Sequence, residues 1–258
     1  MIPKKIHYCW FGKNPLSDLA KNCIESWKKF CPDYEIIEWN ESNFDVNSCE
    51  YAKQAYEAKK WAFVSDVARL YALVNYGGIY MDTDVEVLKP LDDFLSNSAF
   101  SGFEATDRIP TGIMAAEKGQ PLFVELLEEY NNARFLLNNG EYDLTTNVIR
   151  ITETCKKYGL RLDNSLQTVN GFTLYPFDYF CPKDGLTKKI TLTENTHVIH
   201  HFDGSWLTDV DKLEIELTPK YMKFLGRKLG GLYARFVAIK RLKGFRSAVK
   251  ETLKWLKK

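Results

Sequence analysis

The sequence of 258 residues has no apolar run of the eighteen or more residues that a membrane-spanning helix needs. Its N-terminus has no signal-peptide apolar segment, so we expect a cytoplasmic protein. Six scattered cysteines without CxxC spacing or a zinc quartet favour reduced thiols over a disulfide framework. Walker loops, Gly-x-Gly-x-x-Gly, internal repeats and low-complexity tracts are also absent from the sequence. What is left is a globular chain whose 45% hydrophobic content can form a substantial core.

Charge is divided unevenly along the chain, although the formal net charge is only +1. Residues 220–258 carry thirteen Lys and Arg against one acid, a net charge of +12. The preceding 219 residues carry 22 basic and 33 acidic side chains, a net charge of −11. We therefore expect one domain at 1–219 and a basic tail at 220–258.

Strand and helix patterns alternate in the acidic part of the chain. The predicted elements are a strand at 5–10, a helix at 17–30, a strand at 34–39, an apolar helix at 51–76 and a strand at 79–82. Alternation of this kind predicts an α/β fold with a mostly parallel sheet. Ligands of such sheets bind beyond the carboxyl ends of the strands, where residues 10–12 and 82–84 are both expected.

Two carboxylates, Asp82 and Asp84, end the strand that follows Gly77-Gly78. Mg²⁺ and Mn²⁺ take oxygen ligands and are usually held by one or two carboxylates together with substrate phosphates. An Asp-x-Asp at a strand end is therefore a place where a divalent cation can meet a diphosphate. Two exposed acids in a turn are also common, so the spacing alone leaves both interpretations open.

The apolar helix upstream contains two charged residues, Asp66 and Arg69, three positions apart on one face. Charges in a buried helix are costly unless they contact each other or a ligand. One interpretation is an ion pair that supports the next strand. The other places both residues on the wall of a pocket that also contains Asp82 and Asp84.

Two stretches of this region resemble one enzyme family. They are 65–70, Ser-Asp-Val-Ala-Arg-Leu, and 76–84, Tyr-Gly-Gly-Ile-Tyr-Met-Asp-Thr-Asp. Both look like the signature of the DXD-motif sugar transferases of glycosyltransferase family 32. That family includes yeast-type mannosyltransferases and bacterial capsular-polysaccharide transferases, and clostridial glucosylating toxins are more distant relatives. The opening stretch 2–12 is similar to the family's first strand and nucleotide-binding loop, and the similarity runs through about residue 210.

The resemblance implies a GT-A-type fold, a Rossmann-like mixed sheet flanked by helices, and a metal-dependent hexosyl transfer that retains anomeric configuration. Asp82 and Asp84 would hold Mn²⁺ or Mg²⁺, and the implied donor is a UDP-hexose. Asp66 and Arg69 are expected to orient the donor sugar. The expected acceptor is a glycan or lipid-linked saccharide, as in the synthesis of a capsule or another surface polysaccharide. No nucleic acid partner is expected.

The first strand would supply the nucleotide site, with Trp10, Phe11 and Gly12 as binding residues. A tryptophan after the first strand stacks on the base in the toxin catalytic domains, so the resemblance makes Trp10 a candidate for stacking on uracil. Without the resemblance, an aromatic residue at a strand end is more typical of a core position.

A second motif near the metal is expected at 197–206, His-Val-Ile-His-His-Phe-Asp-Gly-Ser-Trp. Strand alternation puts Ile199 and His201 on one face and His200 on the other. The His-Phe-x-Gly pattern resembles retaining transferases of the glycogenin type, whose histidine completes the metal shell, and this selects His201. Ser205 and Trp206 stand where those enzymes continue with Lys-Pro-Trp, so they are expected to contact the diphosphate.

Gly112 lies in a short strand predicted at 111–115. A glycine allows the backbone to approach a ligand closely, and it equally serves as a turn residue. In the related enzymes this loop faces the donor sugar. The sequence leaves both interpretations open.

Two other functions use the same acids. A phosphoryl hydrolase commonly holds two cations and so needs more carboxylates than Asp82 and Asp84. A noncatalytic module that binds nucleotide sugars is the third class. For the transferase, a double displacement needs a carboxylate nucleophile, for which Glu104 is the candidate. Front-face attack assisted by the leaving phosphate needs none and is the preferred route.

The basic tail has apolar residues at three- and four-residue steps between Leu225 and Leu256. Lys and Arg fill much of the remaining circumference, which predicts a basic amphipathic helix in the interface of an anionic membrane. Gly230-Gly231 is the expected break in this helix. The alternative is a terminal helix that packs its apolar stripe on the acidic domain.

Overall fold

The computed structural model describes residues 1–105, 107–109, 112–185, 187–204 and 207–255. The chain divides into two compact units, one of residues 1–183 and 190–201 and the other of residues 184–189 and 202–258. The division near residue 202 differs from the expected boundary at 219, because Pro219 lies inside helix α7 (Asp209–Lys243). Within the described ranges, no helix has both the length and the apolarity needed to cross a membrane.

Unit 1 is built on a seven-stranded sheet with the order β2-β1-β3-β6-β5-β8-β7. Its strands are β1 (Lys5–Cys9), β2 (Glu35–Trp39), β3 (Gly78–Met81), β5 (Ala99–Gly102), β6 (Ile113–Ala116), β7 (Gln167–Val169) and β8 (Phe172–Tyr175). Strand β1 pairs parallel with β2 and β3, and β5 pairs parallel with β8. Strand β6 runs antiparallel to β3 and β5, and β7 runs antiparallel to β8. The sheet is therefore mixed, as the resemblance implied, and not mostly parallel, as the alternation predicted.

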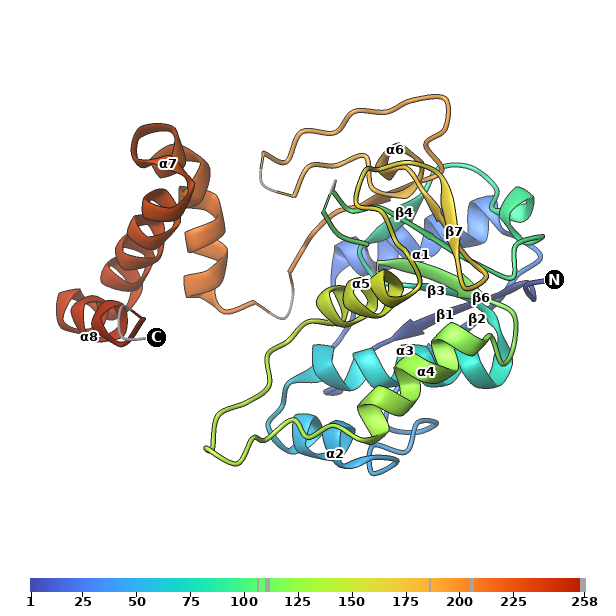
Figure 1. The fold of residues 1–258 in the computed structure, drawn as a ribbon, viewed down its shortest axis with the longest axis horizontal. Helices are drawn as coiled ribbons and strands as arrows, with labels where there is room; N and C mark the ends of the chain where they lie inside the picture. The colour runs from blue at the N-terminus through green and yellow to red at the C-terminus, as the bar shows by residue number, and fades with distance from the viewer. Residues whose placement is uncertain (106, 110–111, 186, 205–206, 256–258) are drawn as a thin grey trace. The chain divides into compact units, whose positions relative to one another are not determined.

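Helices cover both faces of this sheet (Figure 1). They are α1 (Asp18–Phe30) on one face, and α2 (Glu50–Glu57), α3 (Trp61–Tyr76), α4 (Pro121–Asn131) and α5 (Asn147–Lys157) on the other. Successive side chains of β3 point to opposite faces of the sheet. Ile79 and Met81 lie in the core beside α1, and Tyr80 lies in the core beside α3. The expected α/β fold, a mixed sheet flanked by helices, is confirmed. All six cysteines are free and buried.

The apolar helix predicted at 51–76 is in fact two helices. The break lies at residues 58–60, where Lys59 adopts a positive φ of 56°. The amide of Lys60 donates to the carbonyl of Ala55 (2.8 Å), which closes α2 before α3 begins at Trp61. The second helix keeps the predicted buried character, and Asp66 and Arg69 are 6% and 5% exposed.

A small second sheet brings distant parts of the chain together. Strands β4 (Val85–Val87) and β9 (Val198–His200) pair antiparallel, with Val85 opposite His200. Helix α1 holds β4 in place, because the Trp27 indole N–H donates to the Val85 carbonyl (2.7 Å) and the Val87 amide donates to Ser26 Oγ (2.9 Å). These contacts fix the chain directly after the Asp82–Asp84 turn.

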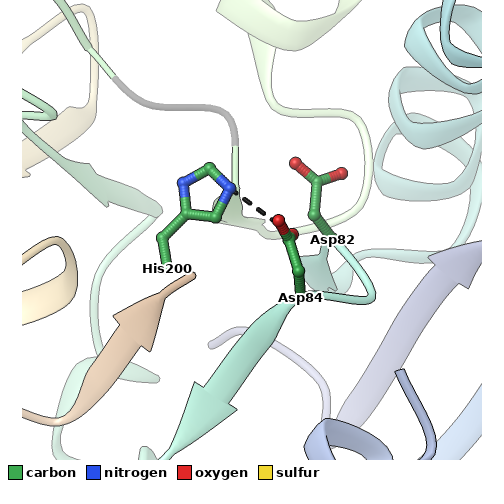
Figure 2. A group of neighbouring side chains, drawn as sticks. All are labelled: Asp82, Asp84 and His200. Carbon is green, nitrogen blue, oxygen red and sulfur yellow. Dashed lines mark ion pairs between the residues drawn. The ribbon is translucent and has the colours of Figure 1, made fainter. Parts of the chain in front are cut away.

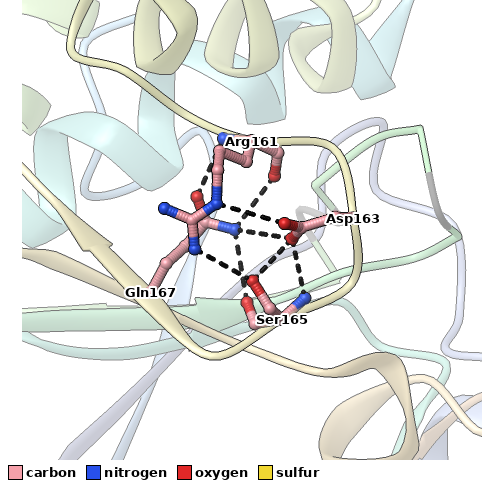
Figure 3. A network of polar contacts seen from close by, with 4 residues as sticks. All are labelled: Arg161, Asp163, Ser165 and Gln167. Atoms are coloured by element: carbon pink, nitrogen blue, oxygen red, sulfur yellow. Dashed lines mark hydrogen bonds and ion pairs between the residues drawn. The ribbon is translucent and has the colours of Figure 1, made fainter.

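The far edge of the sheet is closed by a polar loop between α5 and β7 (Figure 3). The Gln167 side chain accepts from the Arg161 amide (2.8 Å) and donates to the Arg161 carbonyl (2.9 Å), while Asp163 accepts from the amide of Ser165 (3.0 Å). The loop satisfies its own polar groups, so we assign it a structural role. The remaining short elements of unit 1 are a 3-10 turn at Asp92–Phe94 and helix α6 (Phe177–Phe180).

Unit 2 contains α7 and α8 (Phe245–Trp255). Helix α7 is bent back at Gly226, whose φ of 74° and ψ of 171° are not helical. The two halves contact each other, with the Tyr221 and Tyr233 rings 4.8 Å apart. The predicted break at Gly230-Gly231 is wrong, because both glycines are helical and a Cβ at Gly230 would lie 2.6 Å from the Met222 backbone.

The tail therefore does not present one continuous apolar stripe. Its small and β-branched residues, Val210, Ala238, Ile239 and Ala248, form an internal core. Its larger apolar residues are exposed, namely Phe224, Leu225, Leu229, Tyr233, Leu242, Phe245 and Leu253. Leu213 and Phe236 also pack against this core, while the seven residues just named lie at the surface.

Candidate active site

The two acids lie on a turn that links the large sheet to the small one. Strand β3 ends at Met81, the amide of Asp82 donates to the carbonyl of Gly112 (2.8 Å), and the amide of Val85 donates back to the carbonyl of Asp82 (3.0 Å). The turn directs the Asp82 and Asp84 side chains toward His200 (Figure 2). One ligand atom from each of the three residues lies within 4.8 Å of the others. In the part of the chain that the structure describes, no other group of three or more His, Cys, Asp and Glu has this geometry.

The histidine beside the acids is His200 and not His201, which the resemblance selected. Nε2 of His200 lies 3.4 Å from Oδ1 of Asp84, whereas Nε2 of His201 lies 2.8 Å from Oε2 of Glu86. The register explains the difference, because Glu86 is opposite Ile199 and so shares a face with Ile199 and His201. Asp84 precedes β4, so its side chain does not follow the alternation and turns to His200.

Asp66 and Arg69 meet each other, as the ion-pair interpretation required. A guanidinium nitrogen of Arg69 lies 3.3 Å from Oδ1 of Asp66 and 3.3 Å from Oδ1 of Asp82. The same Asp82 oxygen accepts from the hydroxyl of Tyr80 (2.7 Å), over whose ring the Arg69 guanidinium also lies (4.5 Å). The pair is thus connected to the acidic turn, so the two interpretations converge on one charged group.

Burial governs the electrostatics of these acids. It raises the pKa of Asp66 to about 6, although Arg69 opposes the shift. Burial also raises the pKa of Asp82, against the lowering effect of Arg69. Glu104, which follows β5, has a pKa raised by burial and lowered by His200, so it belongs to the same electrostatic group. No double displacement through Glu104 follows from this, because a carboxylate near the cluster is not thereby beneath a sugar.

His200 is half-buried between polar neighbours. Burial lowers the pKa of its imidazole. Hydrogen bonds to Asp84 and to the Cys181 thiol raise this pKa by more than burial lowers it, so the net pKa lies well above the usual value. Without a cation, the imidazolium therefore balances the charge of the acids. Cys181 and Tyr80 were not singled out in the sequence. Tyr80 had a signal, since alternation places it and Asp82 on the same side of one strand.

The residues predicted to bind the nucleotide lie in different surroundings. Trp10 is half-buried and lines a pocket of about 370 Å³ at the carboxyl ends of β1 and β2, and its indole N–H donates to the carbonyl of Asn14 (2.6 Å). Phe11 is 5% exposed and packs edge-on against Phe44, so its ring belongs to the core, and its predicted role in binding the nucleotide stays a prediction. The remaining residues of the pocket are Lys13, Asn14, Glu38, Asn40, Glu41 and Ser42.

Gly12 is required by the local backbone. Its φ is 93°, and a Cβ there would lie 2.7 Å from the indole nitrogen of Trp61. Its amide donates to Oε1 of Glu41 (2.8 Å). The other two expected binding residues, Ser205 and Trp206, lie outside the described residues.

Comparison with known proteins identifies the same region of the chain. Residues 17–101 match the model of the glycosyltransferase sugar-binding region containing the DXD motif. Inositol phosphoceramide mannosyltransferase 3 of Schizosaccharomyces pombe is 29% identical over 53% of this chain and 39% of its own. An uncharacterized glycosyltransferase, L373, of Acanthamoeba polyphaga mimivirus is 26% identical over 87% of this chain and 92% of its own. The chain spans well under half the length of the first two curated relatives that it matches, 39% and 33%.

Solved glycosyltransferase structures are also similar. The PaToxG glycosyltransferase gives a TM-score of 0.47 at 19% identity and covers 60% of this chain and 69% of that one. The galactosyltransferase LgtC gives 0.40 at 12% identity and covers 78% and 88%. The family match ends within β5 and includes Asp66, Arg69 and both acids of the turn. On these sequence matches, residues 17–101 carry the sugar-binding region with the DXD motif, and the chain is similar to glycosyltransferases that contain this region.

Proposed function

We propose that the chain transfers a hexose from a nucleotide sugar to a saccharide acceptor, with retention of configuration, and uses one divalent cation. The observation that carries this proposal is the convergence of Asp82, Asp84 and His200 at a strand end, with ligand atoms within 4.8 Å of one another. The two acids lie on the turn between β3 and β4, and His200 ends β9, which is far away in the sequence. That arrangement suits a cation that also binds a diphosphate.

The donor set decides which cations fit. Two carboxylates and one imidazole suit Mn²⁺, whereas Mg²⁺ prefers oxygen ligands and keeps several waters. Three protein ligands leave coordination positions for the two phosphates. We therefore propose that Asp82, Asp84 and His200 hold Mn²⁺, with Mg²⁺ as a weaker substitute.

The protein side of the mechanism follows from the contacts. Tyr80 and Arg69 both engage Oδ1 of Asp82, which fixes the carboxylate and its second oxygen. Asp66, held by Arg69, would accept a hydrogen bond from a hydroxyl of the donor sugar. The cation, when bound, offsets the negative charge that develops on the leaving nucleoside diphosphate. The sugar can then be attacked from the face that the diphosphate leaves.

The pocket beside Trp10 is the proposed base site. It lies at the carboxyl ends of neighbouring parallel strands, where ligands of α/β sheets bind. Trp10 is partly buried and packs against the core beside α1, which would hold its ring in place for stacking. Its volume of about 370 Å³ is within the range of small-molecule pockets.

The donor is proposed to be a UDP-hexose and the acceptor a glycan or lipid-linked saccharide of a surface polysaccharide such as a capsule. The names of the relatives widen the donors worth testing. They include mannosyltransferases of Schizosaccharomyces pombe and a human α-1,4-N-acetylglucosaminyltransferase. UDP-glucose, UDP-galactose, UDP-N-acetylglucosamine and GDP-mannose therefore form the test panel.

The test measures the products of each donor with Mn²⁺ and with a chelator. We expect one donor to release free nucleoside diphosphate and sugar with Mn²⁺, and the release to stop with the chelator. Release of nucleoside monophosphate and sugar phosphate would instead identify a phosphoryl hydrolase. Donor binding in calorimetry without any turnover would identify a binding module.

Substitutions test which residues hold the cation. Asp84→Asn and His200→Ala should each reduce turnover by at least about 100-fold, because each removes a metal ligand. His201→Ala is the matched control, since His201 is directed to Glu86. The melting temperatures should stay close to that of the wild type for Asp84→Asn, which changes a partly exposed turn residue. Full activity of Asp84→Asn and His200→Ala would refute the metal site.

We further propose that unit 2 docks on an anionic membrane surface. Leu242 and Phe245 are 49% and 60% exposed, and they lie among exposed basic residues, Lys240, Arg241, Lys243, Arg246 and Lys250. This set of seven residues is the basic-apolar patch. Apolar side chains can enter the lipid interface, and each nearby Lys or Arg adds about 1 kcal/mol of attraction to anionic lipid. An enzyme that extends a lipid-linked glycan would gain from this position.

Vesicle co-sedimentation tests the docking. The protein should bind vesicles of phosphatidylglycerol and phosphatidylcholine, bind less as salt rises, and ignore vesicles of phosphatidylcholine alone. Equal binding to both compositions would show that charge has no part in it.

A further inference from the structure

Gly112 contacts two of the three candidate metal ligands. Its carbonyl accepts from the amide of Asp82 (2.8 Å), one step beyond the last pair of the β3–β6 ladder, Met81 and Ile113. Its Cα faces the imidazole of His200, and a Cβ at this position would lie 2.9 Å from Nδ1 and 3.1 Å from Cε1 and Cγ. The His200 ring therefore occupies the space where a side chain at position 112 would lie.

The requirement for glycine here is steric and not conformational. Gly12, Gly77 and Gly78 have positive φ angles, whereas Gly112 is not among the positive-φ glycines, so the observed reason for glycine here is the space that a Cβ would need. Atoms in van der Waals contact are about 3.5–4.0 Å apart. A methyl group at Gly112 would have to displace the ring, the loop or both.

The ring has little room to yield. It is held on the side of Nε2 by Asp84, and its strand is paired with Val85 of β4. The thiol of Cys181 is a further hydrogen-bonding neighbour. Helix α1 in turn fixes β4 through Trp27. A displaced ring must therefore move relative to Asp82 and Asp84.

We propose that Gly112 is a positioning residue of the metal centre: it seats the His200 ring at the distance from Asp82 and Asp84 that one cation requires. The inference rests on the proposed function in naming the cation, but the seating of the ring is a property of the metal-free protein. It adds a third role to the two interpretations of Gly112 from the sequence, because a protein side chain lies where a Cβ would be. Metal ligands tolerate displacements of about 0.2 Å, less than the crowding that a methyl group would relieve.

The first test is a thermal double-mutant cycle without metal. Gly112→Ala should lower the melting temperature of the wild type by about 3–8 °C, because the methyl group overpacks the ring. In a His200→Ala background the same substitution should change it by no more than about 1 °C, since the ring is gone. Equal shifts of the melting temperature in the two backgrounds would refute the claim that a side chain at position 112 clashes with the His200 ring.

The second test is Mn²⁺ binding to the free protein, followed by the electron paramagnetic resonance signal of unbound Mn²⁺. Gly112→Ala should weaken binding by about 10- to 100-fold, as substitutions behind a metal ligand do. Gly231→Ala is the matched control, because that glycine is helical and a Cβ there would meet nothing within 4 Å. It should bind Mn²⁺ like the wild type.

The outcomes separate the two proposals. If His200→Ala leaves Mn²⁺ binding unchanged, the metal site of the proposed function fails, and the thermal cycle still reports on the ring. If His200→Ala weakens Mn²⁺ binding but Gly112→Ala does not, the positioning role is refuted while the metal site stands. A Gly112→Ala protein that melts normally and binds Mn²⁺ normally would overturn the inference outright.

Discussion

His200 gives the metal site a pH dependence whose sign is fixed by its surroundings. Burial lowers the pKa of the imidazole, and the contacts with Asp84 and Cys181 raise it to a net value well above 6.5. A metal must displace the proton, because only the neutral ring is a ligand. Mn²⁺ affinity should therefore rise with pH, by up to about tenfold per pH unit while the metal-free ring is protonated.

Mn²⁺ titrations at pH 5.5, 6.5 and 7.5 measure this slope. His201→Ala should keep it, because His201 is directed to Glu86. His200→Ala should bind weakly and show a smaller slope. An affinity of the wild type that is independent of pH would contradict the assignment of His200 as a ligand.

Asp66, a predicted site residue, lowers the stability of the folded chain when its carboxylate is charged. Burial raises its pKa to about 6, above that of an aspartate in the unfolded chain, although Arg69 opposes the shift. Between about pH 4 and 6 the folded state thus binds more protons than the unfolded state, so stability falls as pH rises through this window. Above it, the charged carboxylate costs about 1–3 kcal/mol.

Asp66→Asn should therefore raise the free energy of unfolding at pH 7.5 by about 1–3 kcal/mol and remove the loss of stability between pH 4 and 6. Denaturant melts at pH 4.5 and 7.5 compare the two proteins. Donor turnover should fall in the same variant, because the amide no longer accepts two hydrogen bonds from a sugar hydroxyl and Arg69. A variant that is less stable at pH 7.5 would show that the ion pair outweighs the cost of burial.

Local patterns in the sequence predicted the elements well and their long-range pairing poorly. Strands β1, β2 and β3 and helix α1 begin and end within one residue of the predicted ranges, because alternation and the Ser17 cap are local signals. The choice between His200 and His201 depends on a register with residues more than a hundred positions away, which no local pattern contains. The packing of the Phe11 ring on Phe44 could not be predicted for the same reason, since only the tertiary fold brings the two residues together.

The bend in α7 is a further feature that the apolar period concealed. Gly226 has φ 74° and ψ 171°, a conformation that is essentially restricted to glycine. The bend allows Arg235 to reach Asp211 (3.3 Å) and Glu214 (2.5 Å) across the two halves of the helix. Sequence periodicity continues through Gly226, so it predicted one stripe where the chain folds back.

Gly226→Ala should destabilise unit 2 by about 1–3 kcal/mol, the cost of holding a non-glycine residue in this conformation. Gly231→Ala is the matched control and should be neutral or stabilising by up to about 1 kcal/mol, since Gly231 is helical and uncrowded. Thermal melts followed by the helical circular dichroism signal compare the two variants. A smaller effect at Gly226 than at Gly231 would show that the bend is not required for stability.

The two units carry different chemistry, and this division bears on how the whole molecule works. Unit 1 contains the proposed metal centre and the base pocket, whereas unit 2 presents the basic-apolar patch. Exposed apolar side chains occur in unit 1 as well, but Leu166 and Leu192, each 58% exposed, lie in stretches without such a cluster of cations. Exposure alone therefore does not distinguish a docking surface, and the combination with positive charge does.

Membrane docking should consequently depend on both components of the patch and leave the chemistry intact. Leu242→Ser with Phe245→Ser should weaken binding to anionic vesicles by about tenfold or more. The two apolar side chains would leave water and enter the lipid interface on docking, and this transfer contributes a few kcal/mol. Replacing Lys240, Arg241 and Lys243 by Gln should weaken it comparably at low salt and flatten its salt dependence. Leu166→Ser with Leu192→Ser, matched in exposure, should bind like the wild type. Nucleotide release from a soluble donor should be the same in all three variants; if the control loses vesicle binding as strongly as the patch variants, the surface that docks is not this patch.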